Sequence, residues 1–157
     1  MRRLIVLVLA AMLMTFTGCG KFKEIKVNSV KMEKVSPYGL RGLNVGLAVE
    51  IDNPAGQIKL SDMEADVEYC GKVLGKVTVD PFTMKGRTLE TYHLKTMVSL
   101  ADDVSLFDML MAIDRNFIDK CTVDITVKGK LKCGLSKTIT KKDIPLKKLM
   151  NYADKKK

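Results

Sequence analysis

Beyond residue 24, apolar and polar residues alternate along most of the chain. The alternation is clearest in residues 121–133, where Val123, Ile125 and Val127 share one phase and the other phase holds threonine, aspartate and lysine. A period of two places the two sets on opposite faces of a strand, so this run predicts a strand with one face in a core. Gly129 falls in the inward phase, where it predicts a bulge or a bend.

Six further runs show the same alternation and predict strands over residues 25–35, 45–51, 62–69, 73–79, 92–100 and 137–144. The first run changes phase near Asn28, as a β-bulge would cause. The second run stops at Asn53-Pro54, because proline has no N–H to donate to a ladder. Gly71-Lys72 predicts a tight turn that joins the third and fourth runs into a hairpin. The last run predicts an edge strand.

One segment follows helical spacing instead. In residues 102–117, Phe107, Leu110 and Met111 recur on one side, and Asp102 supplies an N-cap. This segment predicts one short helix that closes an end of the domain. About seven strands and one helix predict a mainly β fold, an antiparallel β-sandwich of the immunoglobulin or fibronectin III type.

The first 18 residues have the features of an export signal. Arg2 and Arg3 precede an uncharged run, Leu4 to Met14, which is too short for a membrane span of about 20 residues. Small residues then lead to Cys19, the acceptor that thioether lipidation requires. The segment resembles a bacterial lipoprotein signal, and the alternative is an ordinary secretory signal that contains a cysteine. We therefore divide the chain into a signal peptide (1–18), a tether (19–24), a β-sandwich domain (25–149) and a basic tail (150–157).

A lipidated Cys19 would hold the protein on a membrane through acyl chains, because no second apolar run is long enough to span one. An aspartate directly after the lipidated cysteine would resemble an inner-membrane retention signal. This chain has Gly20 at that position, so we expect the outer membrane of a bacterial envelope. Residues 20–24 reach at most about 20 Å, which keeps the domain close to the lipid.

Positive charge is concentrated at the end of the chain. Residues 128–157 contain eleven lysines and two aspartates. Such a cluster could contact an anionic lipid surface or an acidic envelope partner, or it could be a solvated strand face with a frayed tail. We expect no nucleic acid as a partner, since an exported chain rarely meets it and few aromatic residues accompany the lysines. The candidate surface contacts are Lys128, Lys130, Lys132, Lys141, Lys142, Lys147 and Lys148.

Three cysteines remain after Cys19, so at least one is unpaired or pairs between molecules. Their spacing does not fit a zinc site. If residues 121–133 form one strand, Cys121 and Cys133 lie about 40 Å apart, beyond disulfide reach. Only a pair that includes Cys70 is then open within the molecule. Cys70 lies in the acidic, outward phase of its run and is expected near a sheet edge.

The sequence predicts no enzyme, no cofactor and no metal. The single histidine, His93, has no catalytic partner at a known spacing, and it falls on the polar face of its strand. The adjacent carboxylates Asp102 and Asp103 sit where a helix cap belongs. No phosphate loop, His-Glu metal motif or nucleophile elbow is present.

Residues 43–100 resemble the late embryogenesis abundant type 2 domain, also called the water-stress and hypersensitive-response (WHy) domain. The matching features are an apolar strand that ends in Asn53-Pro54, the Ile58-Lys59-Leu60 step and the acidic strand to Tyr69, with hairpin glycines and the later Ile144-Pro145-Leu146. The likeness extends over about residues 25–149. The chain departs from the family pattern at Ala55, because members of the family commonly have a second asparagine at this position. Asn53 can cap its turn and Pro54 fixes the backbone, so we expect a structural role for this motif.

The resemblance implies a seven-stranded sandwich with one helix, no catalysis and a link to desiccation or stress. We therefore expect a membrane-anchored, non-catalytic envelope lipoprotein with a binding or stress-protective domain. Two alternatives are a carrier of a lipid or other apolar ligand, which needs a large apolar cavity, and a subunit of an envelope assembly, which needs an exposed edge or patch.

Overall fold

The structure is a computed structural model that describes residues 24–105 and 117–148. Strands dominate the described residues, and one short helix precedes the seventh strand. The elements are β1 (Lys26–Tyr38), β2 (Gly42–Asn53), β3 (Ile58–Tyr69), β4 (Lys72–Val79), β5 (Phe82–Met84), β6 (Thr88–Leu100), α3 (Phe117–Lys120), β7 (Cys121–Leu131) and β8 (Ser136–Pro145).

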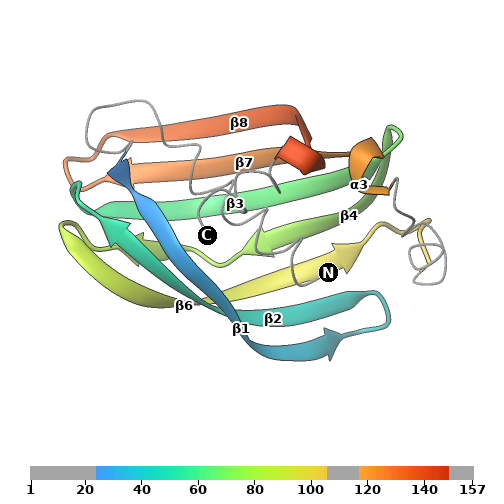
Figure 1. The fold of residues 1–157 in the computed structure, drawn as a ribbon, viewed down its shortest axis with the longest axis horizontal. Coiled ribbons are helices and arrows are strands. Elements are labelled where there is room, and N and C mark those ends of the chain that lie inside the picture. Colours follow the sequence, from blue (N-terminus) through green and yellow to red (C-terminus); the bar gives the residue numbers. More distant parts are fainter. Residues whose placement is uncertain (1–23, 106–116, 149–157) are drawn as a thin grey trace.

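All the strand pairs are antiparallel and join into one twisted sheet (Figure 1). The order is β1-β2-β6-β4-β3-β7-β8, and β5 pairs with β3 alone. β4 pairs with β6 only as far as Val79, opposite Thr96, and β5 then continues beside β3 without pairing to β6. The sheet therefore splits into two layers beyond Val79.

One buried cluster fills the space between the layers. β2 and β7 lie near opposite edges of the sheet, yet their buried side chains belong to the same cluster. The sheet must therefore fold over on itself, which gives a sandwich-like arrangement and confirms the mainly β, antiparallel prediction. The largest fully buried side chains are Leu47, Ile51, Ile58, Leu60, Met63, Met84, Ile125 and Leu146.

The sandwich has two ends, which we name by their turns. The β7–β8 end carries the turn 132–135, the connections 54–57 and 85–87, and the start of β1, all at the left of Figure 1. The register confirms this grouping, since Lys26 pairs with Asp52 at the end of β2. The β3–β4 end carries the turns 39–41 and 70–71 together with α3.

Several sequence predictions are confirmed in detail. The β1–β2 register shifts between Val27 and Ser29, where the phase change predicted a bulge. The β3–β4 hairpin is confirmed, but its turn lies one residue before the predicted Gly71-Lys72, at Cys70 and Gly71. Both residues have positive φ (50° and 79°), which is the geometry of a two-residue type I′ turn. β8 lies at the edge of the sheet and pairs with β7 alone.

Other predictions are wrong. Gly129 is not a bulge, because it pairs in register with Leu60 on one side and Lys137 on the other. The extra residues lie in the neighbouring strands near Asp62 and Asp143, which have positive φ, a conformation that aspartate tolerates better than most residues. The Asp143 N–H also donates to the Asp124 carboxylate at 2.7 Å, which fixes the second bulge.

Cys70 does not lie beside a sheet edge either. β3 runs between β4 and β7, and the exposure of Cys70 comes from its place in the hairpin turn. The sheet has eight strands rather than seven, because β5 is too short to give an alternation signal. Most of the helix expected over 102–117 lies outside the described residues, and Asp102 and Asp103 form a turn.

Candidate functional site

Four lysines gather on the outer face of β3 and β7 at the β7–β8 end of the sandwich. Lys59 of β3 lies directly opposite Lys130 of β7, and Lys128 follows two residues along, opposite Ser61. Lys132 comes just after the end of β7. All four side chains are exposed, and we call Lys59, Lys128, Lys130 and Lys132 the basic cluster.

The basic cluster concentrates like charge. Two like charges directly opposite each other on neighbouring strands destabilise a sheet, and Lys59 and Lys130 form such a pair. Among the described residues, none of the four lysines is held in an ion pair. An anionic ligand at this end would remove the repulsion and provide the missing counter-charges.

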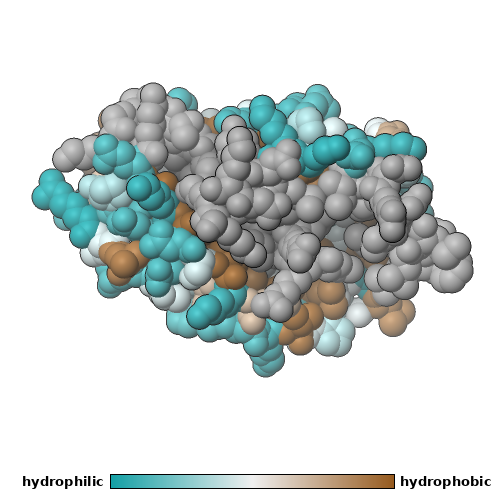
Figure 2. Space-filling view, in the orientation of Figure 1, coloured by the Kyte–Doolittle hydropathy of each residue, from teal (hydrophilic) through white to brown (hydrophobic). Residues whose placement is uncertain are grey.

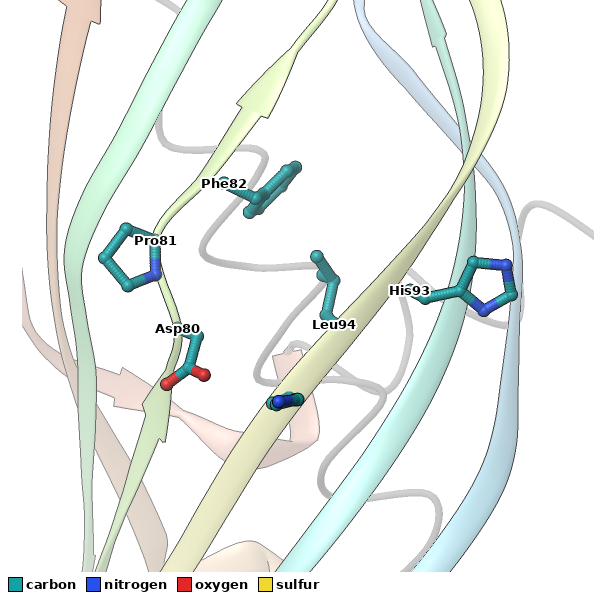
Figure 3. Close-up of a pocket in the computed structure, with 6 residues that line it drawn as sticks. Asp80, Pro81, Phe82, His93 and Leu94 are labelled. Carbon is teal, nitrogen blue, oxygen red and sulfur yellow. The ribbon is translucent and has the colours of Figure 1, made fainter.

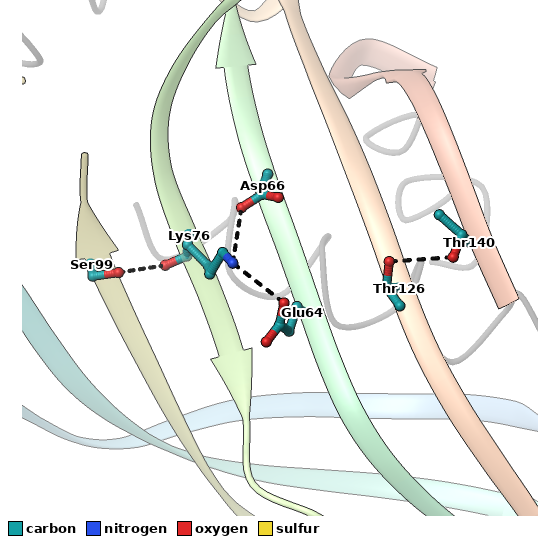
Figure 4. Close-up of polar contacts among 6 residues, drawn as sticks. All are labelled: Glu64, Asp66, Lys76, Ser99, Thr126 and Thr140. Carbon is teal, nitrogen blue, oxygen red and sulfur yellow. Dashed lines mark hydrogen bonds and ion pairs between the residues drawn. The ribbon is translucent and has the colours of Figure 1, made fainter. Parts of the chain in front are cut away.

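The other half of the same face is acidic. Asp66 lies opposite Asp124, and Glu64 and Glu68 flank this pair along β3. Lys76 of β4 partly balances these carboxylates, with its Nζ 3.3 Å from Glu64 and 3.8 Å from Asp66 (Figure 4).

Uncharged threonines lie between the two halves. Thr126 and Thr140 contact each other at 3.5 Å on β7 and β8 (Figure 4). The outer face therefore changes from basic at the β7–β8 end to acidic at the β3–β4 end. Figure 2 views the molecule from the side opposite this outer face, where hydrophilic side chains with a few hydrophobic ones among them lie over the β7–β8 end at the left.

The lysines that the sequence singled out separate into three places. Lys128, Lys130 and Lys132 belong to the basic cluster. Lys141 lies in the middle of β8, opposite Ile125, with Lys142 beside it at the bulge. Lys147 is at the β3–β4 end, where its Nζ lies 2.8 Å from Asp119, and Lys148 follows it. Sequence reasoning missed Lys59, which reaches the cluster only through the pairing of β3 with β7.

The Asn53-Pro54 motif builds the base of the β7–β8 end. The buried Asn53 amide donates to the carbonyl oxygens of Gly56 at 3.1 Å and Lys85 at 2.8 Å, and its Oδ1 accepts from the Ala55 N–H at 3.0 Å. The Arg87 N–H donates to the Ala55 carbonyl at 2.9 Å. These bonds join the connection 54–57 to the connection 85–87, and they occupy both amide donors of Asn53 inside the protein.

A small pocket lies where the sheet splits, between β5 and β6. Its volume is about 220 Å³ and it is lined by Asp80, Pro81, Phe82, His93, Leu94 and Lys95 (Figure 3). This volume is below the range of about 300–1,000 Å³ that is usual for ligand sites. His93 points away from Leu94 and Phe82 (Figure 3), and its Nδ1 lies 2.9 Å from the Glu33 carboxylate. The pocket is therefore smaller than a lipid carrier requires.

Residues 24–105 and 117–148 contain few side-chain arrangements that could form a metal site or a membrane span. No three or more His, Cys, Asp or Glu side chains in these ranges are arranged to hold a metal ion. None of the helices in this part of the chain is both long and apolar enough to cross a membrane. Cys19, the predicted lipidation residue, lies outside the described residues. The basic cluster is therefore the strongest candidate for a functional surface.

Comparison with solved structures gives distant likenesses. A protein from Archaeoglobus fulgidus aligns over 74% of this chain and 94% of its own, with 13% identity and a TM-score of 0.46. A β-glucuronidase of glycoside hydrolase family 2 aligns over 73% of this chain but only 11% of its own, with 9% identity and a TM-score of 0.33. No curated protein matches the sequence.

A sequence model of the family described as late embryogenesis abundant protein matches residues 48–149, more than half of the chain. The match includes the Asn53-Pro54 turn, the hairpin at Gly71 and most of the sheet. This extent confirms the resemblance drawn from the sequence at the level of the family. The chain belongs to the late embryogenesis abundant type 2 family.

Proposed function

We propose that this chain is a lipid-anchored, non-catalytic lipoprotein of the bacterial cell envelope, and that its basic cluster rests on the anionic surface of the membrane that holds it. The anchor would be acyl chains on Cys19. The observation that carries the proposal is the position of the basic cluster at the end of the sandwich where β1 starts.

The short tether determines which end of the sandwich would lie near the membrane. Residues 20–24 reach about 20 Å, whereas a 12-residue strand such as β3 spans about 40 Å. A domain tied to the membrane through the start of β1 would therefore hold its β7–β8 end against the lipid. The acidic half of the outer face of β3 and β7 would then lie away from the lipid. Repulsion from anionic head groups would reinforce the same orientation.

The domain itself would act as a binding or stress-protective module of the WHy type. Membership of the late embryogenesis abundant type 2 family supports a stress-related role. Gly20 after the lipidated position favours the outer membrane. A partner of this module would bind at the surface, where the basic cluster lies.

Acylation is tested in bacteria that express the full chain and grow with an alkyne-labelled palmitate analogue. We expect label on the wild type and on Cys133→Ser, and no label on Cys19→Ala. The Cys19→Ala protein should also leave the membrane fraction. A wild-type chain that carries no label, or label that persists in Cys19→Ala, would refute the lipid anchor.

A further inference from the structure

We infer that Cys70 and Cys121 form a disulfide pair at the β3–β4 end of the sandwich. The pair would join the β3–β4 turn to the start of β7 and leave Cys133 as the odd thiol. This site lies at the opposite end from the basic cluster and serves a different purpose.

The register brings the two residues together. Cys121 is the cross-strand partner of Tyr69, and Cys70 is the next residue along. The Cys70 N–H also donates to the Lys120 carbonyl at 3.4 Å, so the turn stays against the start of β7. Residues in this diagonal relation have Cα atoms about 6 Å apart, which is within the range of about 4.4–6.8 Å that a disulfide needs.

Cys133 cannot compete for either partner. It lies in the turn at the β7–β8 end, beyond the 11 residues of β7. That strand separates it from Cys121 by about 35 Å, and from Cys70 by a similar distance. The sequence allowed Cys70 to pair with Cys121 or with Cys133. The strand register is compatible only with the pair Cys70–Cys121.

The two thiols differ in access, which sets the order of reaction. Cys70 is exposed in the turn, whereas Cys121 is 1% exposed. Burial, together with the charge of the nearby Cys70, raises the pKa of the Cys121 thiol to about 11. An oxidant in solution would therefore react first at Cys70, since the thiolate is the attacking form and must also be accessible.

The reaction with a small-molecule disulfide balances as follows. The Cys70 thiolate attacks one sulfur of the oxidant, forms a mixed disulfide and releases one thiolate. Cys121 then loses its proton and attacks the Cys70 sulfur, which releases the second thiolate. The two cysteines are oxidised, the oxidant is reduced to two thiols, and those thiols take up the two protons that the protein loses.

In the cell the oxidant would be a disulfide donor of the envelope, and this part of the inference rests on the proposed export of the chain. The bond would enclose β4, β5 and β6 in a covalent loop and so restrict the unfolded chain. A loop of about 50 residues should raise the melting temperature by about 8–16 °C.

The test uses the full chain with Cys19→Ser, purified in detergent and treated with oxidised glutathione. The protein is then unfolded, free thiols are alkylated, and peptides are mapped by mass spectrometry. We expect a linked peptide that joins Cys70 to Cys121, with alkylation at Cys133 alone. The oxidised protein should melt at the higher temperature, and reduction should reverse the shift.

Two variants keep the test decisive. Cys133→Ser should form the same bond, and Cys70→Ser, which changes an exposed turn residue, should fold but show no shift on oxidation. Linkage of Cys133 to either partner, or Cys121 that stays fully alkylated after oxidation, would overturn the inference. None of these outcomes depends on acylation or on membrane binding, so they are separate from the fate of the proposed function.

Discussion

Replacing the basic cluster should weaken binding to anionic membranes far more than removing the same charge elsewhere. The change is glutamine at Lys59, Lys128, Lys130 and Lys132. Each lysine near an anionic surface contributes about 1 kcal/mol, so four lysines contribute about 4 kcal/mol. Since 1.4 kcal/mol corresponds to a factor of ten, the affinity should fall about 10³-fold.

The assay is co-sedimentation of the chain from Gly20 onward, which has no acyl anchor, with vesicles. The vesicles contain either anionic phospholipid or zwitterionic phospholipid alone. The matched control carries glutamine at four other lysines, so its net charge is identical. We expect a loss below about 10-fold for this control, because its positions lie in the middle of β8 or beyond it; they are Lys141, Lys142, Lys147 and Lys148.

Equal losses in the two variants would refute the reasoning, because net charge rather than position would then explain the binding. Wild-type binding that is insensitive to salt would refute it as well. Thermal melting provides the control for folding. The cluster variant should be no less stable than the wild type, because the substitution removes the repulsion between Lys59 and Lys130.

Three further predictions concern the domain itself. Asn53→Ala should lower the free energy of unfolding in urea by about 3 kcal/mol, since three hydrogen bonds of about 1 kcal/mol each are lost; the exposed Asn44→Ala should change it by less than about 0.5 kcal/mol. Thr96→Val should raise the same quantity by about 1 kcal/mol, because the buried Thr96 hydroxyl has no partner among the described residues; an unchanged or lower value would count against this. In the reduced protein, in which Cys70 and Cys121 are not linked, the Cys121 thiol should ionise in the unfolded chain near its ordinary pKa of 9.0 but in the folded chain only near 11. Stability should therefore fall as the pH rises from about 9 to 11, and Cys121→Ala should remove that part of the pH dependence of the melting temperature.

The sequence predicted most of the strands because each has one buried face. In β7, Val123, Ile125 and Val127 are buried as their phase required, and a shift of one residue would expose all of them. Alternation does not predict features that depend on the position of a residue in the sheet rather than on its phase. Gly129 occupies an inward slot without bending the strand, and β5 is only three residues long.

The candidate site was predictable only in part. The alternation placed Lys128 and Lys130 on the outer face of one strand, which is a local property. Lys59 joins them through the β3–β7 pairing, between residues about 70 positions apart, and alternation carries no information about which strands pair. For the same reason the sequence could not show that Lys141 and Lys147 lie away from the cluster.

The arrangement of charge on the outer face is the part of the fold that stability alone does not explain. On a surface designed for solubility, charges of both signs are interspersed, and an acidic residue in place of Lys59 would have faced Lys130 with the opposite charge. Here Lys59 faces Lys130, while Asp66 faces Asp124 at the other end of the same two strands. Both pairs oppose folding slightly, and together they give the outer face of β3 and β7 a positive and a negative end. A domain free in solution gains nothing from that polarity, whereas a domain held by a short tether at its positive end gains a fixed orientation on an anionic surface.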